Sequence, residues 1–123
     1  MSKIKLLSFK TNPDFQFRQD GKGRYLRVKL NAEIECKIEN FYFNTSANDD
    51  YDENAYSTIQ YAIGEQIELE LGDIELEVKT GKYEGESFKY FTFKKGTGSI
   101  TKLLIQNGLL KSRPAPTGNV NFK

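Results

Sequence analysis

The chain has 123 residues, of which 28% are charged, with a formal net charge of +1 at pH 7, one cysteine and no histidine. This length favours one domain with its own core, the single cysteine excludes an internal disulfide, and the lack of histidine removes the commonest general base and zinc ligand. Because no apolar run is long enough for a signal peptide or a membrane span, we expect a soluble, unprocessed, cytoplasmic protein.

The first residues predict two strand segments and a turn. Lys3 to Lys10 has the character of a strand, which Asn12-Pro13 interrupts because proline donates no ladder hydrogen bond. Phe15 to Arg18 can resume the strand. The glycines within Asp20 to Gly23 can take positive φ, so this stretch predicts a turn into the next strand.

A long alternating segment follows from Leu26 to Ile38, with apolar residues at even positions and mostly polar residues between them. Period two over this length is typical of a half-buried antiparallel strand. Cys36 falls in the apolar row, so we expect it to be a small core residue and not a reactive thiol. The apolar positions change parity by Phe41, which places a bulge or turn at Glu39-Asn40.

The next segment, Asn44 to Asn54, is polar and acidic and predicts a loop. Its acid spacing resembles the start of a calcium loop, but Ala55 and Tyr61 stand where that loop needs glycine and glutamate. A solvated loop is therefore favoured over a metal site. The sequence leaves open whether the acidic run Asp49 to Glu53 binds a protein partner or an ion. Ala55 to Ile63 predicts a short helix, with a possible cap at the preceding asparagine.

Two further strands are predicted to form a hairpin. Ile67 to Val78 alternates with glutamates and changes parity at a central Gly-Asp pair, which favours one long strand with a glycine bulge over a hairpin that would set glutamates opposite each other. A loop from Gly81 to Glu86 and a strand from Ser87 to Lys95 complete the hairpin. Phe91 and Phe93 share one face of that strand, and we place them in the core.

The C-terminal part predicts a helix and a tail. Ser99 to Asn107 is expected to be helical, with Ser99 as N-cap and Gly108 just past the end. Residues 114–123 contain proline, glycine and asparagine without periodicity and are expected to form an extended arm or tail. We therefore predict a single domain over residues 1–113.

The charges are unevenly distributed along the chain. Residues 1–30 hold eight Lys/Arg and two Asp/Glu, residues 31–80 hold two and thirteen, and residues 81–123 hold eight and two. If the fold brings the two basic ends together, they form a basic face that can attract polyanions although the net charge is close to zero.

The predicted order is three strands, a short helix, two strands that close as a hairpin, and a C-terminal helix. Five strands with a helix between the third and the fourth is the plan of the OB-fold. The predicted fold class is therefore all-β and mainly antiparallel, an OB-fold five-stranded barrel with one short helix and a C-terminal helix. Oligonucleotides bind that fold beside two loops, here Asp20 to Gly23 and Gly81 to Glu86, and both lie in the basic parts of the chain.

This convergence predicts a basic, tyrosine-containing groove for single-stranded nucleic acid. Lysine and arginine neutralise phosphates, while tyrosines stack on bases with little sequence preference. No catalytic residue, metal ligand or cofactor is predicted. The predicted nucleic-acid-binding residues are Lys22, Arg24, Tyr25, Arg27, Lys29, Tyr42, Lys82, Tyr83, Tyr90 and Lys94.

The sequence also resembles the small single-stranded-DNA-binding proteins of bacteriophages, particularly those of lactococcal-type phages. The resemblance rests on size, on the opening MSKIKLLSF, on RYLRVKL after a glycine turn and on GKYEGESFKYFTFKKG. It implies an OB-fold and a role in phage DNA replication or recombination, inside the host cytoplasm. Bacterial relatives end in an acidic tail that recruits partner proteins, whereas this chain ends NVNFK.

The expected partners are single-stranded DNA, with RNA left open, a second or further copies of the chain in a dimer or tetramer, and replication or recombination proteins. A rival hypothesis is a protein-interaction module, such as a phage inhibitor of a host protein, that uses the acidic middle third. A lesser one is a metal-dependent nuclease, because Glu77 and Lys79, with Asp73 or an acid of the Asp49 to Glu53 loop upstream, resemble a carboxylate-x-lysine element. We expect a binding protein and not an enzyme.

Overall fold

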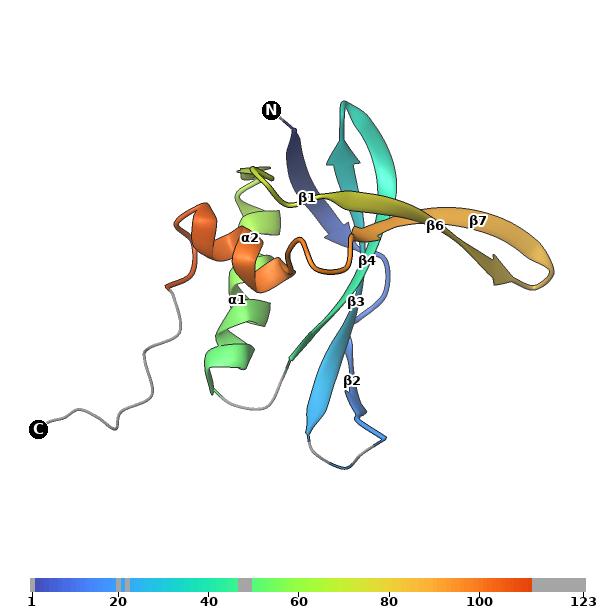
Figure 1. Cartoon of the computed structure of the whole chain (residues 1–123), viewed down its shortest axis with the longest axis horizontal. Coiled ribbons are helices and arrows are strands. Elements are labelled where there is room, and N and C mark those ends of the chain that lie inside the picture. The colour runs from blue at the N-terminus through green and yellow to red at the C-terminus, as the bar shows by residue number, and fades with distance from the viewer. Residues whose placement is uncertain (1, 20, 22, 47–49, 112–123) are drawn as a thin grey trace, which may run out of the picture.

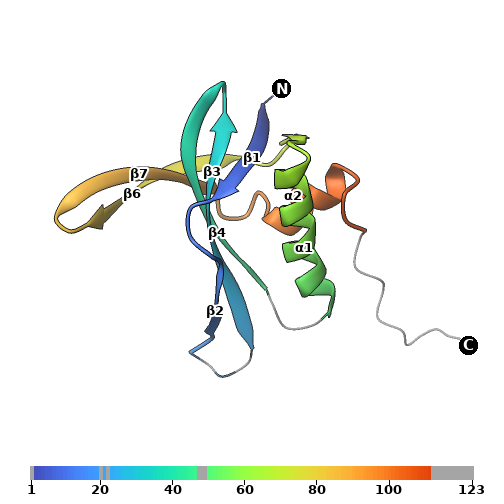
Figure 2. The same ribbon diagram turned by 180° about the vertical axis from the view of Figure 1, so that it is seen from behind.

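The computed structural model describes residues 2–19, 21, 23–46 and 50–111. A curved sheet stands beside two helices that lie together on one side of it (Figures 1 and 2). The elements in chain order are β1 (Lys3–Phe9), β2 (Asp14–Phe17), β3 (Arg24–Ile34), β4 (Lys37–Ser46), α1 (Asp50–Gly64), β5 (Glu68–Glu70), β6 (Leu76–Tyr83), β7 (Glu86–Phe93) and α2 (Ile100–Gln106).

The strands form one sheet in the order β5-β1-β3-β4-β7-β6, and β2 pairs with the N-terminal part of β3. Among the described residues, β4 with β7 is the one parallel pair and the other pairs are antiparallel. The two end strands, β5 and β6, follow each other in the chain, so the sheet curves into a barrel-like form without closing. This is the strand plan of the OB-fold. The predicted all-β, mainly antiparallel class is confirmed.

The described chain has seven strands where five were predicted, because two predicted strands are each divided. Pro13 lies between β1 and β2, as its missing N–H indicated. The prediction of one bulged strand from Ile67 to Val78 is wrong. Its middle is a tight turn, in which the Ile74 N–H donates to the Leu71 carbonyl at 2.9 Å and Gly72 has a φ of +59°. This turn allows β5 to pair with β1 while β6 pairs with β7.

Strands β3 and β4 meet in a two-residue turn at Glu35-Cys36, where φ is +52° and +67°. Positive φ at both turn residues matches the twist of the paired strands. The prediction of one strand from Leu26 to Ile38 is therefore wrong, and Cys36 is exposed at the turn instead of buried in the core. Ile38 lies on the outer face and is 72% exposed, so the parity changes at this turn and not at Glu39-Asn40.

Strands β6 and β7 form a hairpin that projects away from the rest of the molecule (Figures 1 and 2). The loop predicted from Gly81 to Glu86 is reduced to a two-residue turn at Glu84-Gly85, with φ of +51° and +84°. The segment up to Tyr83 belongs to β6. The register therefore continues through most of the predicted loop and fixes the side chains there on defined faces of the hairpin.

Helix α1 begins at Asp50, earlier than the predicted Ala55, and ends at Gly64 as expected. The segment predicted to be the end of an acidic loop forms its first turns. Helix α2 agrees with the prediction, since the Ser99 hydroxyl accepts a hydrogen bond from the Lys102 N–H at 3.2 Å, and Gly108 has a φ of +76°.

The core lies between the inner face of the curved sheet and the two helices. Phe91 and Phe93 pack against it, as predicted, and the ring of Phe93 lies 5.2 Å from that of the fully buried Phe41. In the described part of the chain, no helix has the length and apolar character needed to span a membrane. The tail predicted at residues 114–123 lies outside the described residues.

Candidate nucleic-acid interface

An open groove of about 390 Å³ crosses the outer face of the sheet, on the side opposite the core. Strands β3, β4, β6 and β7 contribute to it. Its lining residues are Arg27, Val28, Lys29, Tyr42, Phe43, Asn44, Gly81, Lys82, Phe88, Tyr90 and Thr92.

The sheet register brings the polar rows of three strands together in this groove. Alternate residues of a strand point to opposite faces, so the residues between the buried positions of β3 and β4 point outward. Lys29 lies opposite Tyr42, and Arg27 lies opposite Asn44. Strand β7 joins β4 through its parallel pair, which brings Tyr90 beside Tyr42.

Three aromatic rings and one ammonium group form the centre of the groove. The rings of Tyr42 and Tyr90 are stacked, with centroids 4.9 Å apart and an interplanar angle of 17°. The ring of Phe88 lies 6.2 Å from that of Tyr42 and 6.0 Å from that of Tyr90. The ammonium of Lys29 lies 5.5 Å from the centroid of the Tyr42 ring, within the range of a cation–π contact.

The lack of a side chain at Gly81 makes room for the Phe88 ring. The two residues are directly opposite each other in the β6–β7 ladder, so their side chains share one face. A Cβ on Gly81 would lie 2.6 Å from Cζ of Phe88, well inside van der Waals contact. The ring can therefore lie across the backbone of β6 only because this position is glycine.

The environment of Tyr42 changes its acidity. Partial burial under its neighbours raises the pKa of the Tyr42 phenol above the ordinary value of 10.0, and the nearby Tyr90 phenol raises it further. Burial disfavours the phenolate, and a second phenolate close by would repel it. The Tyr42 phenol therefore remains a neutral hydrogen-bond donor to a higher pH than an ordinary tyrosine does.

Asn40 holds the base of the projecting hairpin against β4. Its side-chain amide donates to the Lys89 carbonyl at 3.0 Å, and its amide oxygen accepts from the Lys10 ammonium at 2.6 Å. These bonds form close to the Phe41–Phe91 pair, where the ladder between β4 and β7 is made. They help to fix the position of Tyr90 relative to Tyr42.

Five of the ten predicted site residues line this groove, namely Arg27, Lys29, Tyr42, Lys82 and Tyr90. The predicted Lys22 lies outside the described residues.

The other four predicted residues lie elsewhere. The guanidinium of Arg24 lies 4.8 Å above the Phe15 ring, and Tyr25 is opposite Gln16 of β2, beyond the end of the groove. Tyr83 is 70% exposed at the tip of the β6–β7 hairpin. Lys94 forms an ion pair with Glu75 at 3.4 Å.

Sequence reasoning missed two groove residues that have side chains of the right kind. Phe88 has the same parity as Tyr90, which was a usable signal for the same face. Asn44 was assigned to the acidic loop, although it continues the outward row of β4. Phe17, 81% exposed on β2, was also overlooked, and it borders a separate small hollow with Gly21, Gly23 and Arg24.

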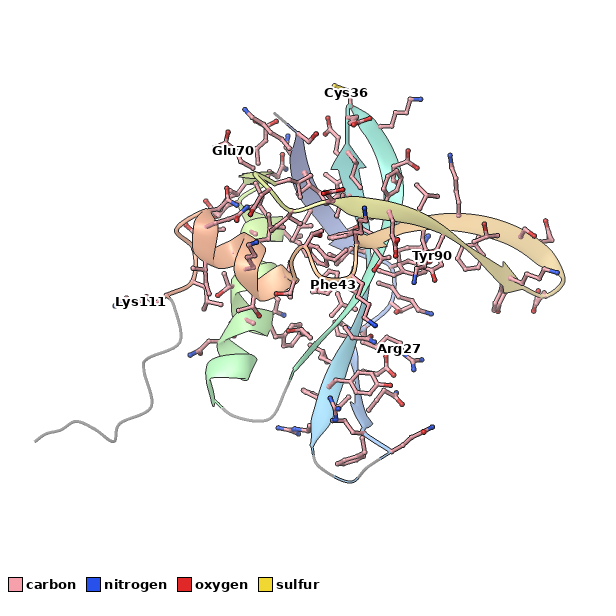
Figure 3. All side chains as sticks on the ribbon, in the orientation of Figure 1. Arg27, Cys36, Phe43, Glu70, Tyr90 and Lys111 are labelled. Atoms are coloured by element: carbon pink, nitrogen blue, oxygen red, sulfur yellow. The ribbon has the colours of Figure 1, made fainter. Side chains whose placement is uncertain are left out.

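Among the described acidic residues of the middle third, none lines the groove, and Glu77 lies opposite the groove residue Thr92. Figure 3 shows Arg27 and Tyr90 beside the sheet centre, with Cys36 and Glu70 at the other end of the molecule. A second hollow at that end mixes Glu33, Glu35 and Glu68 with Lys3 and Lys5.

The residues of the predicted carboxylate-x-lysine element form two separate ion pairs. The Lys79 ammonium lies 3.5 Å from the Glu77 carboxylate, whereas Asp73 pairs with Lys102 of α2 at 3.4 Å. Among the described residues, no three His, Cys, Asp or Glu side chains are grouped so as to hold a metal ion.

Comparisons of this chain with protein-family models, with curated proteins and with solved structures find no match.

Proposed function

We propose that this protein binds single-stranded DNA, without sequence preference, in the groove on the outer face of β3, β4 and β7. The observation that carries the proposal is the stacked pair Tyr42–Tyr90 with the Lys29 ammonium beside it. Exposed aromatic rings next to cations are what a protein needs to hold unpaired bases and their phosphates at the same time.

The groove supplies both interactions from rigid strands. Tyr42, Phe88 and Tyr90 offer ring surface to bases, and stacking on such rings contributes about 1–3 kcal/mol per base. Arg27 and Lys29 neutralise phosphates and so release counterions from the strand. A base pair hides the ring faces of its bases within the duplex stack, so single strands are preferred over duplex.

The biological role proposed with this activity is protection or delivery of single strands during phage DNA replication or recombination. It rests on the resemblance in the sequence motifs together with the basic aromatic groove. The proposed location is the host cytoplasm, where one unpaired cysteine is kept reduced. Replication and recombination proteins are the proposed protein partners.

A titration of fluorescein-labelled oligo-dT by anisotropy tests the proposal. We expect binding at micromolar protein or below at low salt, weakening steeply as the salt concentration rises. The seven tyrosines and the lack of tryptophan allow a second readout, since quenching of tyrosine fluorescence by stacked bases follows the same titration. Matched RNA and duplex DNA oligonucleotides measure the preference.

Two results would contradict the proposal. One is no binding of oligo-dT at micromolar protein in low salt. The other is binding that a Tyr42→Ala/Tyr90→Ala variant retains unchanged while circular dichroism shows an intact fold. A stable complex with a host protein in the absence of any DNA affinity would favour the rival protein-interaction role.

A further inference from the structure

Strand β6 ends the sheet with an open edge. It pairs with β7 on one side, and in the described part of the chain no strand pairs with its other side. The opposite end of the sheet differs, because α2 covers it. There the Asn107 side chain accepts from the Glu70 N–H at 2.8 Å and donates to the Glu70 carbonyl at 3.0 Å. An edge with unpaired backbone groups is a template for another strand.

The register shows which backbone groups of β6 face outward. The Lys94 N–H donates to the Glu75 carbonyl at 2.8 Å, and the hairpin closes with a two-residue turn after Tyr83. In an antiparallel ladder, hydrogen-bonded pairs alternate with pairs that are not bonded, so the odd residues of β6 bond to β7. The N–H and C=O groups of Val78 and Thr80 therefore point to the open edge.

The side chains along this edge are complementary to themselves. Val78 is an exposed apolar residue, 53% accessible, between Glu77 and Lys79. If two copies of β6 pair antiparallel about a two-fold axis at Val78, each Glu77 lies opposite the other copy's Lys79. The two Glu77 carboxylates and the two Lys79 ammonium groups then alternate in sign around the axis. Within each chain, Glu77 and Lys79 already form an ion pair.

Charge also selects this register against its neighbours. Because successive residues of a strand lie on opposite faces of the sheet, the two copies of β6 can pair only in registers that place odd-numbered residues opposite odd-numbered residues. A shift that moves the two-fold axis by one residue places either Glu77 opposite Glu77 or Lys79 opposite Lys79, and like charges facing each other destabilise a ladder. The register centred on Val78 avoids both repulsions.

We propose that β6 is the dimer interface of this protein, where a second copy of the chain adds its own β6 in the register centred on Val78. The hairpin projects from the body, which leaves room for the second copy (Figures 1 and 2). A two-fold axis perpendicular to the sheet keeps both candidate grooves on one face. The pairing itself requires no nucleic acid, so its test is independent of the proposed DNA binding.

Sedimentation equilibrium without nucleic acid tests the interface. We expect a concentration-dependent species of about twice the 14.1 kDa chain mass. Glu77→Lys and Lys79→Glu should each weaken self-association, by about tenfold or more in dissociation constant, because each converts two attractions into repulsions. A 1:1 mixture of the E77K and K79E variants should dimerise again, since their edges carry opposite charges.

A cross-link tests the register. In a Cys36→Ser background, Val78→Cys places two thiols across the two-fold axis, at the Cα separation of about 5.5 Å that suits a disulfide. We expect rapid oxidation to a covalent dimer. Thr80→Cys is the matched control, because Thr80 would face Leu76 of the second copy, and it should cross-link at least tenfold more slowly.

A monomeric wild-type chain at 100 µM would overturn the proposal. So would E77K and K79E variants that each dimerise like the wild type, or a mixture of the two that stays monomeric while circular dichroism shows both folded. Preferential cross-linking through Thr80→Cys would also overturn it, because it would establish a different register.

Discussion

Gly81→Ala should displace the Phe88 ring from the groove while leaving the fold intact. The new Cβ would lie 2.6 Å from Cζ of Phe88 and 3.1 Å from both Cε atoms, whereas ordinary van der Waals contact begins at 3.4 Å. The ring must therefore move by roughly 0.8 Å or more. Phe88 is only half-buried, so it can swing toward solvent, and the stability loss should stay below the roughly 1–3 kcal/mol of an overpacked core.

The consequence for DNA binding follows from the stacking energy of one ring. If a base stacks on Phe88, displacing the ring should cost about 1 kcal/mol, the lower end of the range for a stacked base, which corresponds to about a fivefold weaker affinity. Oligo-dT anisotropy measures this affinity and urea unfolding measures the stability. Gly64→Ala is the matched control, since its Cβ would meet nothing within 4 Å.

A double-mutant cycle makes the prediction specific. Phe88→Ala should weaken oligo-dT binding by itself, and adding Gly81→Ala to it should cause no further loss, because the clashing ring is gone. Two results would refute the reasoning: a G81A variant that binds oligo-dT as tightly as the wild type, or one whose loss persists in full in the F88A background.

Three other predictions address the electrostatics and the core. Because the pKa of Tyr42 is raised in the folded protein, folding holds that proton more tightly than the unfolded chain does, so the stability from this group is present below pH 10 and is lost as the pH rises above it. In an alkaline absorbance titration, Tyr42→Phe should remove a phenol that ionises above pH 10, and an unchanged curve above pH 10 would contradict the raised pKa. Lys29→Ala should reduce the slope of log affinity against log salt concentration by about 1, whereas Lys3→Ala, an exposed lysine on β1, should leave the slope unchanged. Equal slopes for both variants would argue against a phosphate contact at Lys29. Gly98→Ala should destabilise the fold by about 1–3 kcal/mol in urea unfolding, because its Cβ would lie 2.6 Å from Cγ1 of the buried Ile74, and a stability equal to the wild type would show that this contact relaxes freely.

Several elements were predictable because their signals are local. Ser99 and Gly108 mark the ends of α2 through their own side-chain and backbone chemistry. Pro13 interrupts the first strand because it lacks an N–H. Alternation assigned Phe91 and Phe93 to the core side of β7, since parity within one strand decides the face.

The β3–β4 turn was missed for an equally physical reason. Glu35 and Cys36 take positive φ without the glycine or asparagine that usually marks such a turn. The alternation of apolar residues continues through them, so the sequence carries no local sign of the reversal. The alternation therefore predicted that Cys36 is buried with the apolar row, whereas in the structure it is exposed.

The order of residues within one strand decides which of them share a face, and this separated Tyr90 from Phe91 and Phe93, and Lys29 from the apolar row that begins at Leu26. Which strand lies beside which is decided by non-local hydrogen bonding and by closure of the core, and local patterns do not contain that information. Only the tertiary structure brought β7 next to β4, stacked the two tyrosines and separated Tyr83 and Lys94 from the groove.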